Sequence, residues 1–379
     1  MARKINRVKV DLGSYPHYLI MGVKKVGKTT LFSDLVDYLY PNHPEKGILI
    51  SCGDEDGYKG LDQLQYEEVF EWDKVEDSDG NRGLVQAFDE IISLRGTDEQ
   101  IDLVCIDTLD EFVELAIGQV KEEHRSDKGK YPISMNEALG GYGAGQKRVT
   151  ELMMEQIRRL NQAGLAVFIL AHTKVKEQTD PLTQDPYEMI TNNLDSRYYN
   201  PVANSAQMVV NIVMDRNIEG VTETKKKVKG KEETIVIAGR QTTMERNMYF
   251  RENPFVDAGG RFKGLPEKLP LSAENFMKAF KMGVEASQKT QMSNDEYNER
   301  LTEEQNKNIE NGIKLHKKEI QQKKKDIAQE INIKLSSNPP KEVLTEVVKE
   351  IQELGLKSFD DESLKNVEIE QLQNILKLF

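Results

Sequence analysis

The sequence has few cysteines and no long apolar run. Only Cys52 and Cys105 occur among 379 residues, and both lie in or beside apolar runs typical of strands. Two such cysteines do not form a disulfide framework, so we expect a reducing, cytoplasmic environment. No apolar stretch approaches the roughly 20 residues needed to cross a bilayer, and no apolar signal-peptide core follows the basic segment 1–9. These absences predict a soluble, intracellular protein without a membrane partner.

The sequence also lacks an excess of positive charge. Its formal net charge is -12 at pH 7. Such a surface does not attract nucleic acid as a whole, so any contact with DNA would need a local basic patch. The length exceeds that of one small core and predicts one large domain with an appendage.

The first half of the sequence alternates short apolar runs with amphipathic stretches. This pattern is typical of an α/β fold in which a mostly parallel sheet carries helices on both faces. The predicted strands are 18–21, 47–51, 103–106 and 165–170, with a short edge strand at 68–72. The predicted helices are about 28–40 and 146–162, with helical spacing also in 85–92. An antiparallel extension of the sheet is predicted from the β-rich segments 208–214, 234–238 and 244–250.

The composition changes near residue 284, where glycine and aromatic residues become rare. A helix is predicted at 272–281 before this point, with Ser272 as its N-cap. We therefore predict one large α/β domain over 1–283, a charged helical connector over 284–340 and a small helical unit over 341–379. The apolar stripe of the last unit predicts that the tail recruits a partner protein.

The segment Gly22-Val23-Lys24-Lys25-Val26-Gly27-Lys28-Thr29 matches the P-loop pattern G-x-x-x-x-G-K-[ST] in full. It lies between an apolar strand and an amphipathic helix, which is the context that a P-loop requires. Glycines let the backbone wrap phosphate, Lys28 reaches the β- and γ-phosphates, and Thr29 offers its hydroxyl to Mg²⁺. The predicted nucleotide contacts are Gly22, Val23, Lys24, Lys25, Val26, Gly27, Lys28, Thr29 and Thr30. We predict ATP with Mg²⁺, and GTP stays open because no motif fixes the base.

A P-loop site also needs an acidic residue, from another part of the chain, to hold the metal. Asp107 directly follows the apolar run 103–106 and fits a Walker B motif, so Thr29 and Asp107 are the predicted metal residues. An aspartate that merely ends a strand is the alternative.

The residue that activates the attacking water is less clearly marked. Thr108 follows Asp107, where many P-loop ATPases place a glutamate, so we look to the end of the second strand. Glu55 is the preferred base, and Asp54 and Asp56 compete with it, because this strand end lies at the ligand-binding edge of an α/β sheet. The other reading is a solvated acidic loop. His172, after the strand 165–170, is a candidate γ-phosphate sensor or a structural residue.

Two long loops are predicted at the same edge of the sheet, over 123–146 and 174–207. Loops of this length are usually functional or disordered, and these offer cations, aromatic rings and glycines suited to single-stranded DNA. The candidate DNA contacts are Lys128, Lys130, Tyr142, Lys174, Lys176, Arg197 and Tyr198. Plain surface loops are the alternative. The basic run 225–231 reads as a solvated hairpin tip.

The arrangement resembles the phage-encoded RecA-like nucleotide-binding proteins, AAA-type ATPases that include single-strand annealing and recombination ATPases. The resemblance spans about residues 8–283. It is carried by Gly22–Thr30, Cys52–Gly57, Val69–Trp72, Asp107, Gly140–Gly145, Ala171–Lys174 and Gly260–Pro266.

The resemblance implies a RecA-like core, a bacterial host cytoplasm and self-association into a ring or filament. The nucleotide would then lie between subunits, with Arg251, Arg261 or Lys263 acting in the neighbouring site. The implied function is ATP hydrolysis coupled to single-stranded DNA in recombination, annealing or replication. The alternatives are a nucleotide-dependent adaptor with little hydrolysis and a helicase or helicase-loading motor.

Overall fold

The computed structural model describes most of the chain, in two compact units, Met1–Asn308 and Ile309–Phe379. The described residues are 17–54, 56–180, 182–219, 222–228, 231–237, 240–288, 293–337, 339–356, 359 and 363–379, with the backbone alone for 217–243 and 294. The predicted base Glu55 therefore lies outside the described residues.

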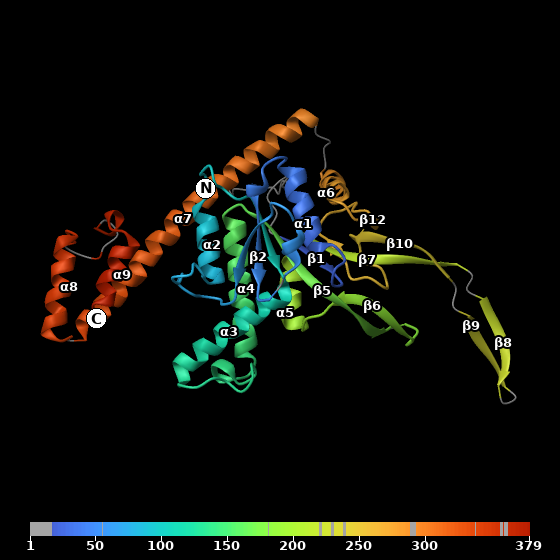
Figure 1. The fold of residues 1–379 in the computed structure, drawn as a ribbon, viewed down its shortest axis with the longest axis horizontal. Helices are drawn as coiled ribbons and strands as arrows, with labels where there is room; N and C mark the ends of the chain where they lie inside the picture. The colour runs from blue at the N-terminus through green and yellow to red at the C-terminus, as the bar shows by residue number, and fades with distance from the viewer. Residues whose placement is uncertain are drawn as a thin grey trace, which may run out of the picture. The chain divides into compact units, whose positions relative to one another are not determined.

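A central sheet organises the first unit (Figure 1). Its strands are β1 (Tyr18–Gly22), β2 (Gly47–Cys52), β3 (Gln65–Val69), β4 (Leu103–Asp107), β5 (Ala166–Thr179), β6 (Pro186–Asn192), β7 (Met208–Glu219), β10 (Arg240–Tyr249), β11 (Gly259–Gly260) and β12 (Lys268–Pro270). The strand order is β12-β10-β7-β1-β5-β4-β2-β3, with β6 paired to β5 and β11 paired to β7. β8 (Thr222–Val228) and β9 (Lys231–Ile237) form a separate two-stranded sheet.

The core strands from β7 through β1, β5, β4 and β2 to β3 are parallel, which confirms the predicted α/β fold. The antiparallel extension begins with β10 and β12. The prediction was wrong in assigning 208–214 to that extension, because β7 pairs in parallel with β1. A parallel strand needs a crossover connection, and α5 (Ser196–Ser205) lies in the segment that was predicted as a loop. Residues 234–237 of the predicted segment 234–238 were also misassigned, since β9 pairs with β8 in a separate two-stranded sheet, and residue 238 lies outside the described residues.

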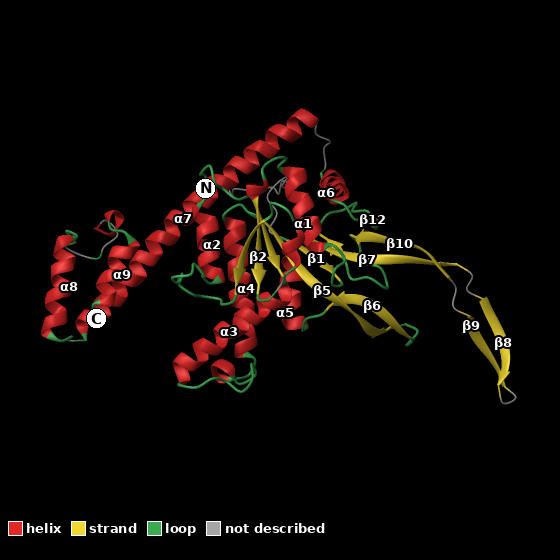
Figure 2. Cartoon of the chain, viewed as in Figure 1, coloured by secondary structure: helices red, strands yellow, loops and turns green. Residues whose placement is uncertain are grey.

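Helices cover both faces of this sheet (Figure 2). The remaining helices of the first unit are α1 (Lys28–Leu39), α2 (Leu84–Ser93), α3 (Leu109–Lys128), α4 (Ala144–Gln162), α6 (Ala273–Ser287) and the start of α7 (Asn294–Ser336). Short 3-10 turns are η1 (Pro44–Lys46), η2 (Gly57–Gly60) and η3 (Ala138–Gly140). α1 packs against α6, whereas α4 packs against α2 and α3. Ser272 caps α6 by accepting a hydrogen bond from the Asn275 N–H, as predicted.

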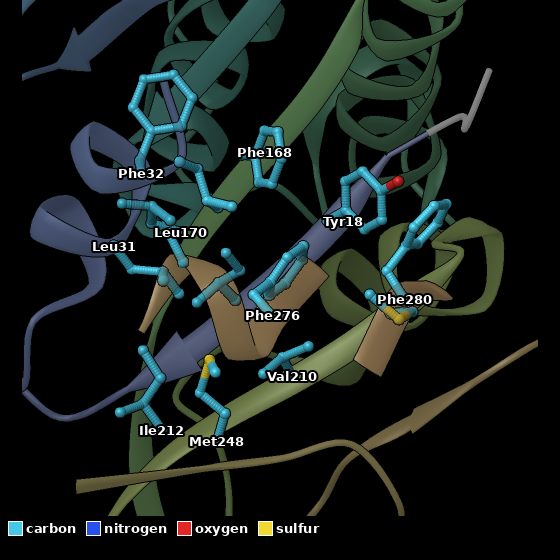
Figure 3. Close-up of a cluster of buried hydrophobic side chains, with 14 of the residues drawn as sticks. Tyr18, Leu31, Phe32, Phe168, Leu170, Val210, Ile212, Met248, Phe276 and Phe280 are labelled. Atoms are coloured by element: carbon cyan, nitrogen blue, oxygen red, sulfur yellow. The ribbon is translucent and has the colours of Figure 1, made fainter. Parts of the chain in front are cut away.

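The core beside α1 and α6 is built from alternate residues of the strands, because successive strand side chains point to opposite faces. Tyr18 of β1 stacks on Phe168 of β5 with ring centroids 4.9 Å apart, and Phe276 of α6 meets Tyr18 edge-on. Figure 3 shows these rings with Ile212 and Met248 in one buried cluster. The same alternation decides which residues at the strand ends face α1.

The second predicted long loop is largely regular structure, whereas the first keeps an irregular stretch over 129–143 that contains only η3. α3 continues to Lys128 before the first, and α4 begins at Ala144. In the second, β5 runs on to Thr179 and forms an antiparallel hairpin with β6, followed by α5. Asp195 caps α5 by accepting the Arg197 N–H. The candidate DNA contacts of the second loop therefore lie on β5 and α5, because backbone pairing continues past the apolar run that predicted the strand.

The second unit holds the end of α7, α8 (Lys341–Glu353), η4 (Ser363–Asn366) and α9 (Ile369–Lys377). Its own apolar core includes Ile331, Val347, Leu372 and Ile375. The division falls at Asn308 and not near residue 284, because Tyr297 and Leu301 of α7 pack against the core of the first unit. In the described part of the chain, no helix is both long and apolar enough to cross a bilayer.

Candidate nucleotide-binding site

The P-loop follows the carboxyl end of β1 and leads directly into α1. Gly27, the N-cap of α1, has φ 109°, and Lys25 has φ 63°. A side chain at Gly27 would be strained in this left-handed conformation and would also lie 3.2 Å from Leu271 Cδ2. The glycine lets the loop turn tightly into the helix.

The first turn of α1 is suited to bind an anion. No side chain caps it, and the first N–H groups of a helix have no partner within the helix. Lys28, only 5% exposed, donates from Nζ to the carbonyl oxygens of Gly22 at 3.0 Å and Val23 at 3.3 Å. These bonds hold the ammonium group at the loop, where it can reach phosphate oxygens.

Thr29 and Asp107 meet across the pocket. Thr29 Oγ1 donates a hydrogen bond of 3.0 Å to Asp107 Oδ2. Asp107 ends β4 on the face that α1 covers, because it alternates with the core residues Leu103 and Cys105. A hydroxyl and a carboxylate are hard oxygen donors, so this pair fits an Mg²⁺ ion that also binds phosphate.

A cavity of about 570 Å³ surrounds these groups. It is lined by Lys24, Lys25, Gly27, Lys28, Thr29, Thr30, Asp54, Asp56, Gly57, Asp107, His172 and Arg246. Its volume falls in the range of small-molecule sites. Among the other predicted contacts, Gly22 and Val26 are buried behind the loop and Val23 is exposed outside the lining.

The acidic turn after β2 closes one side of the cavity. Asp54 and Asp56 line it on either side of Glu55, and Asp56 forms an ion pair with Lys59. In η2, a Cβ placed on Gly57 would lie 3.2 Å from Thr29 Oγ1. The backbone of this turn thus approaches the proposed metal pair closely.

His172 lies beside the P-loop, since β5 pairs His172 with Gly22. Its backbone N–H donates to Asp110 Oδ2 at 3.1 Å, and its Nδ1 lies 3.5 Å from the same oxygen. Burial raises the pKa of Asp110, but the hydrogen bonds from His172 outweigh burial and the pKa lies below its ordinary value. The carboxylate therefore orients the imidazole at the cavity wall.

Arg246 also lines the cavity, although the sequence analysis did not select it. It belongs to β10, more than 200 residues from the P-loop. No local motif marks it, and only the pairing of β10 with β7 brings it to this edge.

The predicted trans-acting residues lie elsewhere. Arg251 is exposed two residues after β10 ends. The Arg261 N–H donates to the Gln207 carbonyl, and its guanidinium donates to the Asn204 carbonyl at 2.7 Å, both at the amino end of β7. Lys263 is exposed two residues further along. Arg261 thus lies near the amino end of β1, since Gly260 pairs with Met208 and Met208 pairs with Tyr18, whereas the P-loop follows the carboxyl end of β1.

The candidate DNA contacts differ in their exposure. Tyr142 is fully exposed, whereas Tyr198 is only 9% exposed and offers little ring surface. Lys128 pairs with Asp127, and Lys130 is exposed two residues after α3 ends. Lys174 donates to the Asn193 carbonyl on the β5–β6 hairpin, where Lys176 is half-buried.

A second cavity, of about 760 Å³, runs between α4 and α5, and we call it the α4–α5 groove. Its lining is Gly143, Gln146, Lys147, Arg148, Thr150, Glu151, Met154, Glu155, Arg158 and Arg197. It brings Arg197 together with three basic residues of α4 that the sequence analysis did not select. Several of these cations are paired, Arg197 with Asp195, Arg148 with Glu123 and Lys147 with Glu151.

Comparison with known proteins agrees with the geometry of the first cavity. A search of curated proteins gives no match. A protein-family description, the AAA domain, matches residues 14–262, which include the P-loop, Asp107 and His172. Since this match covers more than half of the sequence, the chain belongs to the AAA domain family of nucleotide-binding P-loop ATPases.

Proposed function

We propose that the protein binds and hydrolyses ATP with Mg²⁺ and uses the nucleotide to act on single-stranded DNA, in recombination, annealing or replication of phage type. The observation that carries the ATPase part is the 3.0 Å bond between Thr29 and Asp107 beside the buried Lys28. A nucleotide site needs these three groups together, and they come from one helix, α1, and one strand, β4.

Each group has a distinct task in this proposal. The N–H groups of the loop and of α1 bind phosphate oxygens, and Lys28 leaves the Gly22 and Val23 carbonyls to bind them too. Thr29 and Asp107 would hold Mg²⁺, which would supply positive charge beside the phosphate chain. A carboxylate of the turn that contains Asp54, Glu55 and Asp56 accepts a hydrogen bond from the attacking water and takes its proton.

The basic and aromatic groups near α4 support the DNA part of the proposal. Tyr142 offers an exposed ring on which a base can stack, and Arg197 with Arg158 offers guanidinium groups for phosphates. Lys128, Lys130, Lys174 and Lys176 extend the set, whereas the buried Tyr198 is left out. The net charge of -12 requires such a local surface.

Self-association into a ring or filament is part of the proposal. Arg261 and Lys263 lie away from the pocket of their own subunit. They could therefore bind nucleotide only in the pocket of a neighbouring subunit, which requires an assembly. Arg251 is the third candidate for this role.

A nucleotide-dependent adaptor with little hydrolysis is the second candidate function. One observation favours it: Thr108, which follows Asp107, caps α3 by accepting the Glu111 N–H at 3.4 Å. Many P-loop ATPases have a glutamate at this position, but here Thr108 stabilises the start of α3. A helicase or loading motor would in addition unwind strands.

The test is ATP turnover with and without single-stranded DNA, with Lys28→Ala as the blank and GTP in parallel. Stimulation by DNA supports the proposed function, and turnover that ignores DNA rejects its DNA part. Nucleotide binding without turnover would favour the adaptor, and a strand-displacement assay identifies a helicase.

A further inference from the structure

Arg246 is the cation of the nucleotide pocket that belongs to no P-loop motif. We propose that its guanidinium group binds the phosphate chain of the nucleotide held by the same subunit. This inference rests on the proposed nucleotide function and adds a residue to that site. Each pocket would then receive one arginine from its own chain and would not need a neighbouring subunit to supply it.

The strand register places Arg246 at the P-loop edge of the sheet. Gly22, where the P-loop begins, pairs with Ile212 of β7. Arg246 pairs with Met214, two residues further toward the carboxyl end of the same strand. Arg246 therefore extends past the end of β1, where α/β sheets bind their ligands.

Strand alternation places Arg246 on the face of the sheet that α1 and α6 cover. Met248, two residues along β10, is fully buried in the cluster that faces α1 and α6 (Figure 3). Because residues two apart share a face, Arg246 lies on the α1 side of β10. Asn247 and Tyr249, on the other face, both donate to Asp215.

The guanidinium group lies close to the phosphate-binding turn. A Cβ placed on Gly27 would be 3.8 Å from Arg246 Nη1. The backbone of Arg246 is fixed, since its carbonyl oxygen accepts the Leu271 N–H at 2.9 Å. Leu271 Cδ2 would lie 3.2 Å from the same Cβ, so the Leu271 side chain and the Arg246 guanidinium group both lie beside Gly27.

The chemistry of the site suits a phosphate ligand. Among the described residues, no carboxylate forms an ion pair with Arg246, in contrast to Arg197, which Asp195 binds. A planar guanidinium group binds phosphate through two parallel N–H donors. Since Lys28 lines the same cavity, the phosphate chain would be bound by two cations.

The experiment compares Arg246→Ala and Arg246→Lys with wild type, with Arg216→Ala as the matched control. Arg216 is exposed on β7, lies on the same face and does not line the cavity. For Arg246→Ala we expect kcat/KM for ATP and ATP affinity to fall roughly tenfold to a hundredfold. Arg246→Lys should fall between Ala and wild type. Unaltered ATP binding by Arg246→Ala would overturn the proposal.

Mixing variants separates action within a subunit from action between subunits. Arg246→Ala is mixed with Lys28→Ala, which keeps its own Arg246. If the arginine serves its own pocket, turnover stays at the level of the separate variants. If turnover recovers, Arg246 serves a neighbour and the proposal fails.

The two hypotheses fail differently. If wild type and Lys28→Ala bind ATP equally poorly, the nucleotide function itself is wrong. If Lys28→Ala loses binding while Arg246→Ala matches wild type, only the role of Arg246 is wrong. Thermal unfolding of each variant checks that it folds.

Discussion

The nucleotide pocket and the α4–α5 groove both gather cations, but they hold them in different ways. In the pocket, Lys28 is buried, and its Nζ donates to the carbonyl oxygens of Gly22 and Val23 in the loop. In the groove, Arg148, Lys147 and Arg197 are bound by carboxylates on their own or neighbouring elements.

This difference predicts how strongly each region binds. A ligand that enters the pocket meets donors already fixed by the loop, so little ordering is required. Single-stranded DNA that enters the groove must displace exposed ion pairs, each of which contributes about 1 kcal/mol or less to stability. We therefore expect large effects from substitutions in the pocket and small, salt-dependent effects in the groove.

The largest expected effect is that of Lys28→Ala. Removing the buried ammonium group should lower turnover at least about a hundredfold, because it binds the charge that develops on the phosphates. Arg216→Ala, which removes an exposed cation outside the cavity, serves as the control and should retain most activity. Equal losses of turnover in both variants would show that the effect does not depend on the position of Lys28 in the pocket.

The acidic turn is the next test. Glu55→Gln should lower turnover about a hundredfold while ATP still binds, because general base catalysis contributes on this order. Asp54→Asn and Asp56→Asn are compared in parallel, since both line the cavity. Normal turnover by Glu55→Gln, with a loss in either aspartate variant, reassigns the base.

Gly57→Ala tests how closely the turn approaches the metal pair. The added Cβ would lie 3.2 Å from Thr29 Oγ1, so we expect Mg²⁺-dependent ATP binding to weaken about tenfold. Gly60→Ala is a matched control in the same turn, because a Cβ there meets nothing within 4 Å. Titrating nucleotide with and without Mg²⁺ measures the effect, and identical behaviour of both variants would contradict it.

The groove should respond weakly. Arg197→Ala is expected to lower affinity for single-stranded DNA a few-fold and to reduce the slope of log affinity against log salt by about 0.7. Lys314→Ala, an exposed lysine paired with Glu310 on α7, is the control. Binding that is independent of both Arg197 and salt would remove the groove from the proposed DNA surface.

The smallest expected effect concerns Asp110. Its pKa is lowered in the folded protein, so it contributes stability above the ordinary carboxyl pKa of about 3.9, and that stability is lost as the pH falls through the lower folded pKa. Asp110→Asn should therefore be less stable than wild type by about 1 kcal/mol at pH 7, with a smaller difference at pH 3. Urea unfolding at both values measures this, and a difference independent of pH would contradict it.

The sequence by itself determined the parts that depend on neighbours in the chain. The apolar run before Gly22, the glycines of the loop and the helix after Lys28 are contiguous, so their pattern predicted a P-loop between a strand and a helix. Asp107 was selected in the same way, from the strand that it ends. Ser272 was recognised as an N-cap because capping is local.

Only the tertiary structure decided which distant residues join the pocket. Arg246 reaches it through the register of β10 on β7, and the parallel direction of β7 depends on the crossover through α5. Strand pairing brings together residues far apart in sequence, and no local pattern encodes the partner or the register. The burial of Tyr198 and the ion pair of Arg197 also follow from packing between elements and capping at α5, so exposure could not be read from residue type.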